Sequence, residues 1–274
     1  MKKHGFTLIE LLVVISIIAL LMSIMVPTLS RAKKMASGSV CLANQRNLIT
    51  AWLTYTVDNN NKLVGGNTYQ TGWPGIEYQW CKEPMNDDGS FETEKMNITQ
   101  RQRENGIKAG NLYDYIQDVK VYNCPADKRA KQSPPYNPYR TYAITGVMYG
   151  EDAAANHNGV IAYTNIAQIS RPGEKYVFVE EYAPNQYVNQ GSWQLKITAT
   201  KATSGWWDAM AVWHSSRSTL SFCDGRAEMI KWSDKRTIEY SLGDSSSGSV
   251  QPDNGDLQYL LNGYGGIPSG AEAQ

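Results

Sequence analysis

The sequence lacks an excess of either charge, and it lacks the short motifs that mark several enzyme classes. Its 274 residues include 26 Lys plus Arg and 26 Asp plus Glu, so the formal net charge is zero. A nucleic-acid-binding protein normally carries a basic excess, and this balance argues against that class. Neither a P-loop nor a zinc-site motif is present, so the chain carries no nucleotide-driven motor of its own.

Cysteine is scarce as well. The chain has four, and no two of them have the C-x-x-C spacing of a zinc ribbon or a thioredoxin-like site. In an oxidising compartment outside the cytoplasm, four cysteines allow two disulfides in three connectivities, and the alternative is four buried thiols. A hydrophobic fraction of 42% with 17 Tyr and 8 Trp predicts a folded domain.

The most informative stretch is the apolar run from Phe6 to Met25, which is long enough to cross a membrane as a helix. It contains one charge, Glu10, and an acid at the middle of such a helix costs roughly 2.5–3.5 kcal/mol, less near an end. Lys2 and Lys3 precede the run and predict a cytoplasmic N-terminus with the bulk of the chain on the far side. No A-x-A cleavage site follows, which argues against an ordinary secretory signal peptide.

The residues K-K-H-G-F-T-L-I-E resemble the type IV prepilin leader shared by pilins and type II secretion pseudopilins. The resemblance implies that a membrane peptidase cuts after Gly5 and methylates the new amino terminus at Phe6. The new amine would lie one helical turn before Glu10, the i,i+4 spacing at which opposite charges meet. In the family this acid pairs with the amine of a neighbouring subunit, which implies an assembly role for Glu10. The alternative is a plain single-pass anchor with an interfacial acid.

The helical pattern continues beyond the apolar run and predicts one long helix from Thr7 to Asp58, bent at Pro27. Gly38 weakens this helix locally by about 1 kcal/mol. The expected sheet-facing stripe comprises Leu29, Ala32, Ala36, Val40, Ala43, Ala51 and Tyr55. The expected opposite face comprises Arg31, Lys33, Lys34, Gln45 and Arg46.

Short strand-like segments separated by Gly, Pro and Asn follow residue 60. The predicted strands are V-K-V-Y at 119–122, R-T-Y-A-I-T-G-V-M at 140–148 and K-Y-V-F-V-E-E-Y at 175–182. Two further runs flank Asp224–Gly225, a dipeptide typical of a two-residue hairpin turn. The expected fold is α+β and pilin-like, with a long N-terminal helix packed on an antiparallel sheet. Its expected segments are a leader (1–5), a transmembrane half-helix (6–26), an amphipathic half-helix (27–58), a β-rich extracytoplasmic domain (60–260) and a tail (261–274).

His214 stands ten positions before Asp224, so that nine residues separate it from Asp224–Gly225. This spacing resembles the prepilin-type processing-associated family named for its H-X9-DG motif, which is abundant in planctomycete-like and verrucomicrobial bacteria. S-R-A-K-K-M-A, C-L-A-N-Q-R-N-L and C-P-A-D resemble further segments of that family, and the last two contain Cys41 and Cys124. On this basis we expect the pairings Cys41–Cys124 and Cys81–Cys223.

Two interpretations of the H-X9-DG residues remain open. His214 and Asp224 could form a catalytic dyad, but an enzyme also needs a nucleophile and an oxyanion site. The favoured interpretation is structural: His214 makes a hydrogen bond that fixes the hairpin, while Asp224 and Gly225 serve its turn. We therefore expect no catalytic residue.

Two ligand-binding alternatives come from side-chain composition. Asp244, Asp253, Asn254 and Asp256 crowd one loop and could offer the oxygen ligands of calcium, although their spacing is not that of an EF-hand and solvated acids in a turn are the commoner case. No other cofactor is expected. Exposed tryptophans can stack on sugars, but tryptophan more often packs in a core. The tryptophans considered are Trp73, Trp80, Trp193, Trp206, Trp207 and Trp213.

The sequence as a whole predicts a structural, pilin-like (pseudopilin) subunit rather than an enzyme. Its expected location is the bacterial inner membrane as a single-pass protein, with its C-terminal domain in the periplasm and a cell-surface filament as a further location. Its expected partners are prepilin peptidase, sister subunits and an assembly platform of the type II secretion or type IV pilus kind, and nucleic acid is not among them. The alternatives are a membrane-anchored module that binds polysaccharide and an exported enzyme working through His214.

Overall fold

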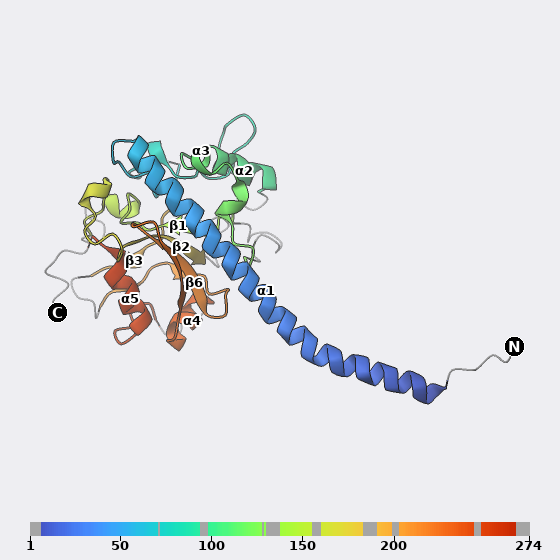
Figure 1. The fold of residues 1–274 in the computed structure, drawn as a ribbon. Coiled ribbons are helices and arrows are strands. Elements are labelled where there is room, and N and C mark those ends of the chain that lie inside the picture. Colours follow the sequence, from blue (N-terminus) through green and yellow to red (C-terminus); the bar gives the residue numbers. More distant parts are fainter. Residues whose placement is uncertain are drawn as a thin grey trace.

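The computed structural model describes residues 7–70, 72–93, 98–127, 129, 138–154, 160–182, 191–198, 203–243 and 248–266. One helix of 51 residues, α1 (Leu8–Asp58), lies across a mixed α and β domain and projects far beyond it (Figure 1). The other helical elements are η1 (Ile76–Tyr78), α2 (Gln100–Lys108), α3 (Tyr113–Ile116), η2 (Val119–Tyr122), η4 (Glu151–Ala153), η5 (Ile166–Gln168), α4 (Lys235–Ser241) and α5 (Gly255–Tyr264). The strands are β1 (Tyr142–Ile144), β2 (Tyr176–Tyr182), β3 (Leu195–Lys196), β4 (Gly205–Trp206), β5 (Ala209–Met210), β6 (Arg217–Phe222) and β7 (Ala227–Lys231).

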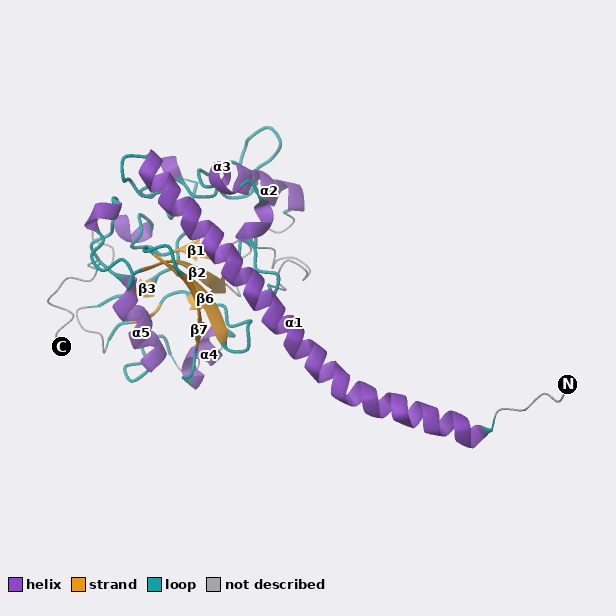
Figure 2. Ribbon diagram, in the orientation of Figure 1, coloured by secondary structure: helices purple, strands orange, loops and turns teal. Residues whose placement is uncertain are grey.

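The main sheet is antiparallel throughout, with the order β1-β2-β6-β7 and with β5 paired to the end of β2. β3 and β4 form a separate two-stranded sheet. In Figure 2 the strands lie between α1 and the two C-terminal helices. A long N-terminal apolar helix on an antiparallel sheet is the predicted α+β, pilin-like architecture.

The helix α1 continues through Pro27, as predicted, and its projecting part curves away from the domain (Figure 1). Only the C-terminal half of α1 packs against the domain, where β6 and β7 are its main partners in the sheet. The residues that it buries are Gly38, Cys41, Asn44, Gln45, Leu48, Ile49, Ala51, Trp52, Tyr55 and Thr56.

The predicted stripe on α1 was therefore largely wrong. Leu29, Val40 and Ala43 are exposed, whereas Gln45, which was expected on the solvent side, is fully buried. Gln45 Nε2 donates a hydrogen bond of 3.0 Å to the Thr219 carbonyl on β6. A buried amide is tolerated when it has such a partner, so polarity alone gave the wrong face.

The predicted hairpin forms from β6 and β7, but its turn differs from the expected one. The loop has three residues, Cys223 to Gly225, and the Phe222 amide donates to the Arg226 carbonyl on the opposite strand. Gly225 has φ 92°, the left-handed conformation that closes a three-residue loop after a tight turn.

Two further expectations fail. V-K-V-Y is the 3-10 helix η2 rather than a strand, and Asp118 caps its start by accepting from the Lys120 amide at 2.9 Å. The predicted tail from residue 261 begins inside α5, where Leu261 and Tyr264 are fully buried in the core. Tyr176 of β2 explains this, because its hydroxyl donates a hydrogen bond of 2.9 Å to the Leu260 carbonyl and so anchors α5 to the sheet.

Candidate functional site

The first candidate site is the projecting part of α1. Its apolar side chains are exposed from Leu8 (78%) to Met35 (74%), and no other part of the described chain covers them. By length and composition it is the one helix of the described residues that could cross a membrane, with a mean hydropathy of 2.8 in its most apolar window. Such a surface needs lipid or other helices around it, because an uncovered apolar face of this size is unfavourable in water.

Glu10 begins this apolar surface, within the first turn of α1. Its Oε2 accepts hydrogen bonds from the Thr7 amide (2.8 Å) and hydroxyl (2.7 Å), and the Glu10 amide donates to Thr7 Oγ1 at 3.3 Å. This reciprocal arrangement is a capping box, which satisfies two amides at the helix start. Gly5 and Phe6, the predicted processing residues, lie outside the described residues.

The second candidate site is the junction where α1 meets the domain. A disulfide joins Cys41 of α1 to Cys124, which follows η2, with a Cα–Cα distance of 5.4 Å. The expected Cys81–Cys223 pairing is not formed, since both are free, buried thiols. Burial raises the pKa of each of these two thiols to about 12.

His214 lies beside this disulfide. Its Nε2 is 3.4 Å from Cys124 Sγ and 3.2 Å from Glu180 Oε1 on β2. Thr219 Oγ1 donates to the same carboxylate oxygen at 2.7 Å. Sequence reasoning missed Glu180, although an acid inside the apolar strand K-Y-V-F-V-E-E-Y was a usable signal, because buried acids need partners.

The structure does not bring His214 and Asp224 together, because the six-residue strand β6 separates them. Asp224 instead accepts from the Arg226 amide (3.1 Å) and from Arg226 Nε (3.2 Å) within the turn. Gly225 supplies the positive φ of that turn. No dyad of these two residues is formed, and the pair has separate structural roles.

The described side chains of the acidic loop bind mainly to the protein's own backbone. Asn254 caps α5 by accepting from the Leu257 amide at 3.0 Å. Asp256 Oδ2 accepts from the Ser233 and Asp234 amides at 2.9 and 2.8 Å. Asp253 is exposed, and Asp244 lies outside the described residues. Asn254 Oδ1 and Asp256 Oδ2 therefore accept hydrogen bonds from backbone amides rather than facing a shared cation position.

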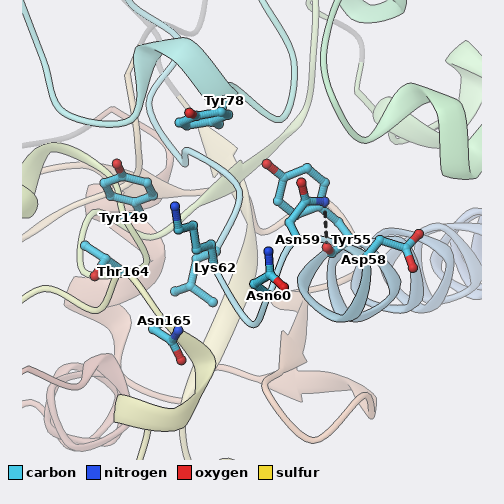
Figure 3. Close-up of a pocket in the computed structure, with 10 residues that line it drawn as sticks. Tyr55, Asp58, Asn59, Asn60, Lys62, Tyr78, Tyr149, Thr164 and Asn165 are labelled. Carbon is cyan, nitrogen blue, oxygen red and sulfur yellow. Dashed lines mark hydrogen bonds between the residues drawn. The ribbon is translucent and has the colours of Figure 1, made fainter.

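A pocket of about 470 Å³ opens at the end of α1 that lies farthest from the apolar part. Lys62 extends between the rings of Tyr78 and Tyr149, and Tyr55 and Asp58 of α1 form the opposite side (Figure 3). Sequence reasoning missed it, because its residues come from four separate segments.

Of the six tryptophans considered for sugar binding, three are buried, Trp73 and Trp213 are half-buried, and one is exposed. Trp80, Trp193 and Trp206 are buried in the core, while Trp207 is 57% exposed. Trp206 stacks on Tyr240 with ring centroids 5.6 Å apart. The buried rings are therefore packing residues and are not available to a ligand.

Comparison with known proteins found a matching family model and a similar protein. A family model described as the prokaryotic N-terminal methylation motif matches residues 1–26. The chain is 44% identical over 60 residues to the type IV wide pilus major component PilA4 of Thermus thermophilus. That alignment covers 22% of this chain and 46% of the relative, so the chain spans about half the length of the curated relative it matches. No solved structure gives a significant match.

The matched segment leads into the part of α1 that the structure leaves uncovered. The rest of α1 packs on an antiparallel sheet. Motif, relative and architecture agree on a membrane-anchored or filament protein. At its N-terminus the chain is therefore similar to type IV pilins and carries their methylation motif.

Proposed function

We propose that the chain is a pilin-like structural subunit that prepilin peptidase cleaves between Gly5 and Phe6 and that then assembles through α1. The observation that carries the proposal is the exposed apolar surface of α1 from Leu8 to Met35, which the protein's own domain leaves uncovered. Exposing one such side chain to water costs about 1.5–3 kcal/mol, so a subunit that leaves the membrane needs neighbouring helices to cover this surface.

Before assembly the same surface would lie in the bacterial inner membrane. The basic residues Lys2 and Lys3 favour a cytoplasmic N-terminus, which leaves the sheet domain in the periplasm. The filament would be of the type II secretion or type IV pilus kind, and its partners would be sister subunits and an assembly platform. The matched relative is a major component of a wide pilus, which supports a filament role.

The experiment is to determine the intact mass and the N-terminal residue of the protein purified from its native membranes. A chain that begins at N-methylated Phe6 supports processing and the filament proposal. A chain that still begins at Met1 contradicts processing, because the new amine needed opposite Glu10 would never form.

A second candidate function is a membrane-anchored module that binds polysaccharide. The pocket beside Tyr55 favours it, because tyrosine rings and the asparagine amides among its lining residues suit sugar stacking and hydrogen bonding. A glycan array with the full chain tests it, and Tyr78→Ala with exposed Tyr259→Ala as a control locates the site. Absence of any glycan signal, or equal loss in both variants, would count against this candidate.

A further inference from the structure

Four side chains that can bind a metal ion meet at the junction between α1 and the sheet. They are Cys41 on α1, Cys124 after η2, Glu180 on β2 and His214 in the turn that leads into β6, and all four are buried. One ligand atom from each lies within 4.8 Å of every other. Four segments far apart in the sequence thus bring two sulfur atoms, one imidazole nitrogen and one carboxylate oxygen close together.

Two of the distances match the edges of a zinc coordination tetrahedron. Zinc–nitrogen and zinc–oxygen bonds of about 2.0–2.1 Å and zinc–sulfur bonds of about 2.3 Å give nitrogen–oxygen edges near 3.3 Å and nitrogen–sulfur edges near 3.5 Å. His214 Nε2 lies 3.2 Å from Glu180 Oε1 and 3.4 Å from Cys124 Sγ. The imidazole, the carboxylate and one sulfur are therefore already spaced as ligands.

The polar atoms at this point are not fully satisfied without an ion. Glu180 is completely buried, and its Oε2 has no hydrogen-bond partner. Leaving a buried acceptor unsatisfied costs about 1–3 kcal/mol, and more when the group is charged. A divalent cation bound through Oε1 would compensate for this electrostatically, because it places a positive charge beside the carboxylate as a whole.

We propose that the reduced form of this protein binds one zinc ion through Cys41, Cys124, Glu180 and His214. Two thiolates, one carboxylate and a neutral imidazole around Zn²⁺ give a net charge of −1, the same as in a structural site of three cysteines and one histidine. All four positions come from the protein, so the site is closed and structural. The ion holds α1 on the sheet in the chain that has not yet formed its disulfide.

The disulfide and the zinc site exclude each other, because two zinc-bound sulfurs lie about 3.8 Å apart. A disulfide-bearing oxidant converts one form into the other. Its S–S bond breaks and accepts two electrons and two protons to give two thiols, while the Cys41 and Cys124 thiolates lose two electrons, form their S–S bond and release Zn²⁺. Zinc binding to the reduced chain in turn releases the two thiol protons.

The test uses the full chain in detergent, reduced with a phosphine and freed of metal, and then titrated with Co²⁺ as a spectroscopic substitute for zinc. The expected result is one Co²⁺ per chain, with a thiolate-to-cobalt charge-transfer band and the intense visible bands of tetrahedral Co²⁺, both removed by added Zn²⁺. The oxidised chain is expected to show neither band.

Matched variants assign the ligands. Cys41→Ser, Glu180→Gln and His214→Gln each remove one ligand and are expected to weaken binding by at least the 10–100-fold typical of losing a supporting residue. Cys81→Ser and Cys223→Ser change buried cysteines outside the cluster and are expected to bind Co²⁺ as the unaltered chain does. Circular dichroism of each metal-free variant separates loss of a ligand from loss of the fold.

A readout on the unaltered chain covers the case in which a variant does not fold. Zinc is expected to slow alkylation of Cys41 and Cys124 in the reduced chain at least tenfold, followed peptide by peptide. The proposal is overturned if the reduced chain gives no thiolate–cobalt band, if zinc leaves alkylation unchanged, or if folded Glu180→Gln and His214→Gln bind Co²⁺ as tightly as the unaltered chain.

Discussion

Arg140 and Glu181 form an ion pair inside the domain, with Nη1 2.7 Å from Oε2 and with side chains that are 0% and 4% exposed. Arg140 also donates to the carbonyls of Tyr142 (2.7 Å) and Gly191 (2.8 Å). One guanidinium thus joins β1, β2 and the segment that begins at Gly191. Glu181 provides a counter-charge to this buried guanidinium, which water does not reach.

Glu181→Gln is expected to lower the free energy of unfolding by about 3–5 kcal/mol, because it removes a buried counter-charge that lies 2.7 Å from the Arg140 guanidinium. Asp87→Asn is the matched control. It breaks the Arg101–Asp87 pair, whose side chains are 76% and 60% exposed, and should cost at most about 1 kcal/mol. Denaturant unfolding of both variants measures the difference, and equal losses would contradict the buried-pair argument.

Gly38 lies where α1 packs closely against Met229 of β7 and against His214. A Cβ built there would lie 2.7 Å from Met229 Cε and 3.4 Å from His214 Nδ1. Gly38→Leu is expected to destabilise the domain by about 1–3 kcal/mol through overpacking, with Ser39→Leu on the exposed side of α1 as the control. Gly38→Ala should be nearly neutral, because the flexible Met229 methyl can move and alanine favours the helix by about 1 kcal/mol. Thermal melting compares the three, and a Gly38→Leu curve that matches that of Ser39→Leu would rule out close packing here.

The free thiols Cys81 and Cys223 should resist alkylation in the folded protein. Burial holds the pKa of each at about 12, so little thiolate forms at mildly alkaline pH and the reagent cannot reach the sulfur. Mass spectrometry without reduction should find no label on the native chain and two labels after unfolding. A peptide map should find Cys41 joined to Cys124, and four labels after unfolding would contradict the disulfide.

Glu151 should make stability fall as pH rises. Burial raises the pKa of its carboxyl, although Ser192 donates to Oε2 from its amide (2.9 Å) and hydroxyl (2.6 Å). Between the unfolded and the raised folded pKa, the folded chain keeps a proton that the unfolded chain has released, so rising pH favours unfolding. Glu151→Gln cannot ionise, so its melting temperature relative to the unaltered chain should increase from pH 4 to pH 7.

Glu104→Gln provides the opposite sign. A hydrogen bond from Gln100 lowers the pKa of Glu104, so the charged form stabilises the fold and the variant should lose relative stability over the same pH range. The pH argument fails if the two variants respond in the same direction.

Two substitutions at Glu10 separate capping from assembly. Glutamine can replace glutamate in a capping box, so Glu10→Gln keeps the helix start but removes the charge, whereas Glu10→Ala removes both. If Glu10 pairs with a neighbouring amine, both variants should enter the membrane, and both should be absent from filaments sheared from the cells. A Glu10→Gln chain that assembles normally would assign Glu10 to capping alone.

Local patterns predicted the elements that depend on neighbours in sequence. The apolar run and the continuing helical period predicted α1 within one residue of its observed bounds, and the turn residues at Asp224–Gly225 predicted the β6–β7 hairpin. The turn itself was misjudged, because Asp–Gly fits both two- and three-residue loops and the strand register decides between them.

Partnerships between distant residues were harder to predict. The Cys41–Cys124 disulfide was expected from a family resemblance, but Glu180 beside His214 and Gln45 on Thr219 were not expected at all. These contacts join positions 34 to 174 residues apart, and no periodicity in the sequence encodes such a pairing.

The sequence by itself determined that this protein carries a long apolar helix with an acid near its start, because helix length and hydropathy are local properties of consecutive residues. The tertiary structure alone decided which face of α1 meets the sheet, which cysteines remain thiols and which side chains surround His214. Those outcomes depend on how segments far apart in the chain pack, and packing selects residues by shape and hydrogen-bond partner rather than by polarity.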